Sequence, residues 1–199
     1  APAVAPPLPE PASGSVDKPL QAAARFMVSA AHPLAVQAGL QMLQRGGSAV
    51  DAGIAVQMVL TLVEPQASGI GGGAFALHWD GLRVQAWDGR ETAPVAADET
   101  LLLAKDGRPL PYAEAAVGGR AVGVPGVLHM LEQAHRQHGR LPWADLFAPA
   151  ISLAEQGFAV SPRLHALLAS DAALKAEPRA AAYFYGADGQ PHAVGHVLR

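Results

Sequence analysis

The segment Glu64-Pro65-Gln66-Ala67-Ser68-Gly69-Ile70-Gly71-Gly72-Gly73 decides how this chain is organised. Four of its ten residues are glycine, and it follows the apolar run Ala49–Val63. Glycine adopts backbone conformations that other residues avoid and lets neighbouring backbone approach closely. A helix that is apolar on nearly every face belongs in an interior. The pattern therefore predicts a buried helix, then a close-packed turn, then a strand.

A phosphate-binding loop is the main alternative for this glycine run. Residues 68–73 lack the Gly-Lys-Ser/Thr ending of a P-loop. They also follow a helix and precede a strand, which reverses the order of a dinucleotide-binding unit. We therefore expect a scaffold turn that binds no nucleotide.

Upstream of the glycine run, the sequence predicts one short strand and one more helix. Residues 25–30 are a short apolar strand candidate. Pro33 is placed to open a helix, and Gly46-Gly47 are placed to end it. Ser48 and Asp51 then have the spacing of a capping box at the start of the buried helix.

Downstream, the sequence predicts a β-hairpin. Residues 75–79 and 82–87 have the alternation of half-buried strands, and Asp80-Gly81 between them is a two-residue turn signal. Arg90 lies just past the end of the second strand.

The rest of the chain is predominantly helical. Apolar stripes predict helices that end at Gly139 and at Gly157, and a third that starts after Ser161-Pro162. After Lys175 we find only turn residues. This order predicts an α+β protein whose helices pack on a mostly antiparallel sheet that is only partly present.

Composition excludes several classes of partner. The 199 residues are 50% hydrophobic and only 16% charged, with a net charge of −3 and no basic stripe, so nucleic acid is not an expected partner. No cysteine is present for a disulfide or a thiolate metal site. No apolar run approaches the roughly 20 residues of a membrane-spanning helix.

Residues 1–24 are predicted to be a flexible Ala/Pro-rich leader. Small residues at the start fit a mature end left by signal-peptide cleavage, which predicts a periplasmic or secreted protein. The alternative is an arbitrary boundary of the sequence.

Candidate metal ligands and nucleophiles are few. His135 and His138, and also His192 and His196, have spacings that can share a helix face, but no third ligand matches them. We expect solvated histidines, no metal and no cofactor. The sequence has no G-x-S-x-G elbow, and its three threonines have no adjacent base, so it carries no complete catalytic set.

Arg90 is the best candidate for a binding residue. A guanidinium at the end of a strand can present a planar fork of donors to a carboxylate. The alternative is a surface arginine that pairs with its own neighbours Asp88 and Glu91.

Taken together, the spaced motifs resemble the start of the γ-glutamyltranspeptidases. The resemblance covers roughly residues 25–165 and rests on several blocks in register, which are more specific than any one glycine run. These blocks are Met27 to Ala35, Gly46-Gly47-Ser48-Ala49-Val50-Asp51-Ala52, Glu64 to Gly73, Asp88-Gly89-Arg90-Glu91-Thr92-Ala93-Pro94, Val122-Gly123-Val124-Pro125-Gly126 and His138-Gly139-Arg140-Leu141-Pro142-Trp143.

The resemblance implies the αββα sandwich of N-terminal-nucleophile hydrolases, incomplete in this chain. It implies a zymogen that processes itself into two subunits and transfers the γ-glutamyl group of glutathione to water or to an amino-acid or peptide acceptor. The nucleophile is the threonine that starts the small subunit, with its own α-amine as base. Arg90 would bind the donor's α-carboxylate, and no catalytic residue lies in this chain.

Residues 25–199 are accordingly expected to be the N-terminal part of the large subunit, inactive alone and partnered by the small subunit. Two alternatives stay open. One is a glutaryl-type β-lactam acylase of the same superfamily, since a glutaryl group keeps a carboxylate for Arg90. The other is a non-enzymatic interaction fragment.

Overall fold

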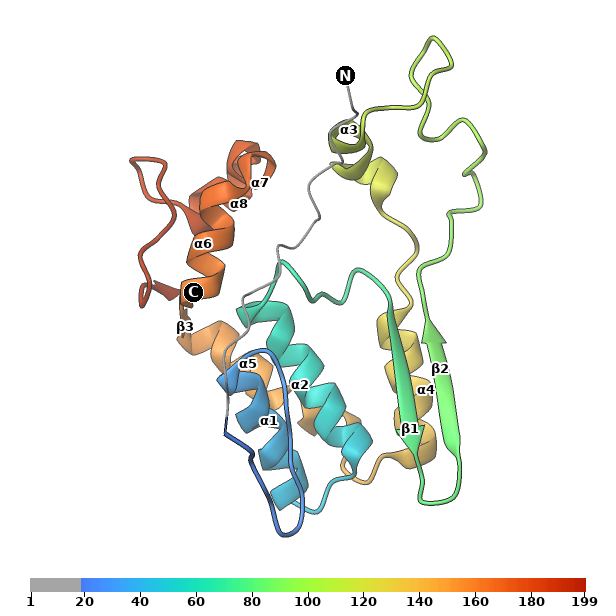
Figure 1. Ribbon diagram of the computed structural model, residues 1–199, viewed down its shortest axis with the longest axis vertical. Coiled ribbons are helices and arrows are strands. Elements are labelled where there is room, and N and C mark those ends of the chain that lie inside the picture. Colours follow the sequence, from blue (N-terminus) through green and yellow to red (C-terminus); the bar gives the residue numbers. More distant parts are fainter. Residues whose placement is uncertain (1–18) are drawn as a thin grey trace.

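The computed structural model describes residues 19–199 and has the α+β composition that the sequence predicts. A packed pair of helices, α1 (Pro33–Gln44) and α2 (Ala49–Val63), lies beside a β-hairpin, and a third group of helices lies near the C-terminus (Figure 1). The remaining elements are β1 (Ala74–Trp79), β2 (Val84–Gly89), α3 (Tyr112–Ala116), η1 (Gly119–Ala121), α4 (Val127–His138), η2 (Trp143–Phe147), α5 (Ala148–Gln156), β3 (Phe158–Ala159), α6 (Pro162–Ser170), α7 (Ala172–Ala176), α8 (Pro178–Phe184) and β4 (Val197–Leu198).

Local capping sets the starts of the first two helices, as the sequence predicts. The His32 ring accepts a hydrogen bond from the backbone N–H of Leu34, and Pro33 occupies the first turn of α1. At the start of α2, the Ser48 side chain accepts from the Asp51 N–H, and the Asp51 carboxylate accepts from the Ser48 N–H. This capping box satisfies backbone donors that a helix N-terminus leaves free.

The carboxylate of Asp51 also joins α2 to the loop after α4. It is fully buried, and its Oδ2 accepts from the backbone N–H groups of Arg140 and Leu141 at 2.9 and 3.2 Å. One side chain therefore ties together segments that are about 90 residues apart in the sequence.

The hairpin is confirmed, but its turn is shifted by one residue. β1 and β2 are antiparallel with Trp79 opposite Val84, and the Asp80 N–H bonds to the Arg83 carbonyl, so Gly81 and Leu82 are the central pair. The Asp80 carboxylate accepts from the N–H groups of Leu82 and Arg83, which stabilises this turn over the predicted Asp80-Gly81 pair.

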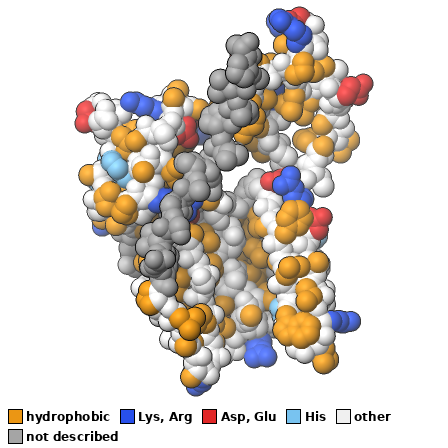
Figure 2. Space-filling model, viewed as in Figure 1, with side chains coloured by type: hydrophobic (Ala, Val, Ile, Leu, Met, Phe, Trp, Pro, Cys, Tyr) orange, Lys and Arg blue, Asp and Glu red, His pale blue; other side chains and the backbone are white. Residues whose placement is uncertain are grey.

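One face of the hairpin packs on α4, and the other is open. The open face carries the larger apolar side chains: Phe75, Leu77 and Trp79 of β1 and Val84 of β2 are 60–78% exposed. Figure 2 shows hydrophobic side chains along this region of the surface. The alternation is therefore confirmed, but the residues expected to be half-buried are exposed, because within residues 19–199 only the other face has a helix against it.

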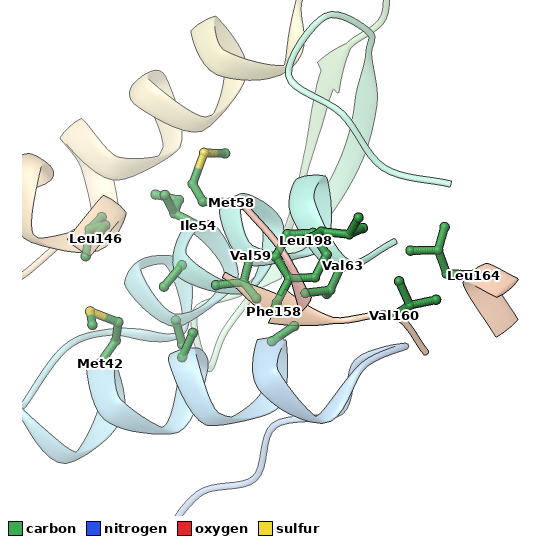
Figure 3. Close-up of a cluster of buried hydrophobic side chains, with 14 of the residues drawn as sticks. Met42, Ile54, Met58, Val59, Val63, Leu146, Phe158, Val160, Leu164 and Leu198 are labelled. Carbon is green, nitrogen blue, oxygen red and sulfur yellow. The ribbon is translucent and has the colours of Figure 1, made fainter. Parts of the chain in front are cut away.

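The main core lies between α1, α2 and the elements that follow α4. It includes Met42 of α1 and the α2 residues Ile54 and Val59, with Leu146 and Phe158 packed against them (Figure 3). The interior position predicted for α2 is thus confirmed.

Three predictions about elements were wrong. Residues 25–30 pair with no strand among the described residues. The helix predicted before Gly157 is divided into η2 and α5, because the chain forms a 3₁₀ turn over Trp143–Phe147. Beyond Lys175, where turn residues were expected, Glu177 caps α8, and β4 returns to pair with β3.

Two further points concern the ends of the chain and the membrane. Residues 1–18 of the predicted leader lie outside the described residues, and 19–24 are exposed without regular structure.

From residue 19 to residue 199, no helix combines the length and apolar character needed to cross a bilayer.

Candidate functional site

Arg90 lies immediately after β2, with its side chain largely exposed. Its backbone N–H donates to the Asp88 side chain at 2.9 Å, which fixes the direction in which the chain leaves the strand. The guanidinium is 66% exposed, and its Nε lies 3.6 Å from the nearer carboxylate oxygen of Glu91. That separation exceeds a hydrogen bond, so the fork of donors is not occupied by its acidic neighbour.

Two glycines bring the surrounding backbone close to Arg90. A Cβ on Gly73 would lie 2.7 Å from the Gly89 carbonyl oxygen and 2.9 Å from the Arg90 Cα. A Cβ on Gly126 would lie 2.6 Å from the Arg90 carbonyl oxygen. The Gly126 N–H also donates to the Gly72 carbonyl at 3.1 Å. The glycine-rich segment and the N-terminus of α4 therefore both pack closely against the end of β2.

The predicted close-packed turn is thus only partly correct. Gly72 and Gly73 are tightly packed, whereas a Cβ on Gly71 would meet nothing within 4 Å and one on Gly69 only a backbone nitrogen at 4.0 Å. Gly73 packs against the end of β2 and Gly72 against the Glu91 side chain, whereas Gly69 and Gly71 have open space beside them.

Glu91 is a further candidate for the site, although the sequence analysis treated it only as a partner of Arg90. Its carboxylate lies against Gly72 and Gly73, and its Oε2 is buried without a hydrogen-bond partner among residues 19–199. A buried carboxylate oxygen without a donor is costly and marks a place where a ligand or another segment can donate. The one feature of the sequence that could have marked Glu91 as a site candidate was its position next to Arg90.

An open cavity of about 420 Å³ lies beside Arg90. Its walls come from residues 90–94, from Leu101 and from residues 120–123. The walls are held together by a backbone bridge, because Thr92 and Val124 exchange hydrogen bonds of 3.3 and 2.9 Å. The volume is within the range of about 300–1,000 Å³ that small-molecule sites occupy.

The histidines form no metal centre, but the expectation that His135 is solvated was wrong. Its side chain is only 16% exposed, and its Nε2 lies 2.9 Å from the Leu141 carbonyl and 3.5 Å from Asp51. α4 turns this side chain toward the start of α2. Among residues 19–199, no group of three or more His, Asp or Glu side chains has an arrangement that could hold a metal ion.

The other paired histidines also have structural neighbours. His138 stacks on His78 of β1 with ring centroids 4.0 Å apart, and its Nε2 lies 2.5 Å from the Gln85 side-chain oxygen. His192 and His196 stack 3.8 Å apart, but they lie outside any helix. Neither pair adds a third ligand.

Comparison with known proteins identifies the family of this chain. The model of the family Gamma-glutamyltranspeptidase matches residues 35–199. The chain belongs to the γ-glutamyltranspeptidase family. Membership includes the αββα fold of N-terminal-nucleophile hydrolases, of which these residues form an incomplete part.

Individual family relatives agree over most of this chain. A glutathione hydrolase proenzyme of Bacillus subtilis is 39% identical over 174 residues, which are 86% of this chain and 30% of the relative. The crystal structure of the Helicobacter pylori γ-glutamyltranspeptidase superposes with a TM-score of 0.83 at 32% identity, covering 90% of this chain and 52% of that one. The chain thus spans about a third of the length of this curated relative.

A cephalosporin acylase is also similar. The Bacillus halodurans structure superposes with a TM-score of 0.70 at 31% identity, covering 93% of this chain and 36% of the acylase. Similarity to both proteins shows that one fold can carry different activities, so the fold alone does not assign one.

Proposed function

We propose that this chain is part of a γ-glutamyltransferase and glutathione hydrolase, and that Arg90 binds the α-carboxylate of the γ-glutamyl donor. The observation that carries the proposal is the exposed guanidinium of Arg90 at the rigid end of β2, facing a cavity of ligand size. A guanidinium binds a carboxylate through two parallel hydrogen bonds, which fixes orientation as well as affinity.

The geometry supports a binding role because the Arg90 backbone is held from both sides. Gly73 and Gly126 bring neighbouring backbone into close packing with the end of β2, and the Asp88 side chain accepts the Arg90 N–H. A preorganised donor loses less free energy on binding than a mobile one.

The remaining chemistry is proposed to come from outside residues 1–199. We propose that 25–199 are the N-terminal part of a large subunit, and that a small subunit from the same precursor carries the threonine nucleophile. Relatives in Bacillus subtilis and Pseudomonas aeruginosa are named glutathione hydrolase proenzymes, which supports processing. Residues 1–199 alone would then be inactive.

Replacement of Arg90 by Gln in the complete processed enzyme tests the assignment. Loss of a charge-assisted contact of about 1.5–3 kcal/mol should raise KM for γ-glutamyl-p-nitroanilide about ten- to a hundredfold, with a smaller change in kcat. Arg83→Gln is the matched control, because the Arg83 side chain is also largely exposed but lies at the opposite end of β2. An unchanged KM in Arg90→Gln would refute the assignment.

The acylase activity is the second candidate, favoured by the similarity to the cephalosporin acylase. Glutaryl-p-nitroanilide keeps a carboxylate but lacks the α-amino group, so Arg90 could bind it equally well. A wild-type enzyme that cleaves the glutaryl amide faster than the γ-glutamyl amide would establish the acylase.

We also propose a location outside the cytoplasm, either periplasmic or secreted, on the Ala/Pro-rich composition of residues 1–24. Fractionation of cells that produce the complete protein tests this proposal.

A further inference from the structure

A second arginine faces the same cavity as Arg90. Arg120 lies in η1 (Gly119–Ala121), about 30 positions further along the chain, and lines the cavity together with Ala121 and Val122. The paired backbone of Thr92 and Val124 fixes this part of the wall to the segment that follows Arg90. The two arginines therefore border one cavity although they come from separate parts of the chain.

The charges around the cavity are unbalanced. Among residues 19–199, Arg90 and Arg120 are the cationic residues in its walls, and Glu91 is the only acidic one. Glu91 lies nearer to Arg90, at 3.6 Å. Within residues 19–199, Arg120 has no ion pair or hydrogen bond from its side chain. By contrast, Arg108, which also lies in the connection between β2 and α4, forms an ion pair with Asp106 at 2.7 Å.

An unpaired guanidinium at the wall of a ligand-sized cavity is suited to bind an anionic group of the ligand. The α-carboxylate of the γ-glutamyl group is already assigned to Arg90. The other carboxylate available in such a donor belongs to the amine portion, when that portion is an amino acid or a peptide with a free C-terminus.

We propose that Arg120 binds the carboxylate on the amine side of the γ-glutamyl amide and so favours donors whose leaving group is an amino acid or a peptide. The inference rests on the proposed function, since it assumes that Arg90 holds the γ-glutamyl end. It makes Arg120 a specificity residue, which acts on the choice of substrate and not on the acyl transfer itself.

Three donors distinguish binding of the amine-side carboxylate from a general effect of Arg120 on activity. Glutathione carries the amine-side carboxylate, its glycinamide analogue lacks only that charge, and γ-glutamyl-p-nitroanilide has no carboxylate on the amine side. Each donor is assayed with the complete processed enzyme and with its Arg120→Gln, Arg120→Lys and Arg108→Gln variants.

We expect Arg120→Gln to lower kcat/KM for glutathione about fivefold, the effect of an exposed ion pair of about 1 kcal/mol. The same variant should leave the other two donors unchanged, and Arg120→Lys should retain most of the activity on glutathione. Arg108→Gln should match the wild type on all three donors, because Arg108 is exposed and lies outside the cavity walls.

An equal loss on all three donors, or no loss on glutathione, would overturn the role of Arg120 while leaving the proposed function intact. A wild-type enzyme that cleaves none of the γ-glutamyl donors would overturn the proposed function, and the role of Arg120 with it.

Discussion

Substitution of Gly73 by Ala tests whether close backbone packing positions Arg90. The added methyl group would lie 2.5 Å from the Glu91 Oε2, 2.7 Å from the Gly89 carbonyl oxygen and 2.9 Å from the Arg90 Cα. The Glu91 side chain can move aside, but the other two atoms belong to the backbone. Ordinary van der Waals contact begins at 3.4 Å, so the two backbone contacts need shifts of 0.7 and 0.5 Å, and the end of β2 must move.

The size of the effect follows from this displacement. A misplacement of about 1 Å in a binding constellation can cost on the order of a hundredfold in rate. A shift of half to two thirds of that distance should lower kcat/KM for γ-glutamyl-p-nitroanilide about tenfold, or about 1.4 kcal/mol. The loss should appear mainly in KM, because Arg90 is proposed to bind the donor and not to react with it.

Two further glycines provide a graded series in the same segment. A methyl group on Gly72 would lie 3.2 Å from the Glu91 carboxylate, which is a mild contact, and one on Gly69 would meet only a backbone nitrogen at 4.0 Å. We expect kcat/KM to decrease from the wild type and Gly69→Ala, which are equal, through Gly72→Ala to Gly73→Ala.

A second donor separates mispositioned Arg90 from general damage to the fold. 4-Aminobutyryl-p-nitroanilide lacks the α-carboxylate, so its slower cleavage should be insensitive to Gly73→Ala. Equal kcat/KM for Gly73→Ala and Gly69→Ala on the γ-glutamyl donor would refute the reasoning, as would an equal loss on both donors.

Two predictions concern stability, measured by thermal or urea unfolding of the complete protein. Asp51→Ala should lower the free energy of unfolding by about 3 kcal/mol or more, since the buried carboxylate accepts three backbone hydrogen bonds; Asp145→Ala, which removes an exposed ion pair with Arg45, should cost less than about 1 kcal/mol. Burial lowers the pKa of His32 below 6.5 although Glu64 opposes the shift, so the unfolded chain takes up the proton first as the pH falls. The stabilising contribution of neutral His32 should therefore be complete above pH 6.5 and decrease as the pH drops below it, and His32→Asn should remove this component of the pH dependence.

Local sequence patterns predicted the longer helices and the hairpin. Pro33, the Ser48–Asp51 capping box and the glycines after α1 and α4 act through neighbours within a few positions, so the starts and ends of these helices could be derived without the fold. α8 was missed because it is short and largely exposed, and β3 and β4 because each has only two residues and depends on the other.

The sequence by itself determined the α+β class, the hairpin and the motifs by which the family can be identified, and it singled out Arg90. Only the tertiary structure decided what surrounds that residue. It brought Gly73 and Gly126 onto the end of β2, placed Arg120 on the same cavity, and turned His135 toward Asp51. These contacts join segments that are tens of residues apart in the sequence. Side-chain periodicity cannot predict them, because it describes only which residues share a face of one element. Which face meets which partner depends on how the whole chain packs.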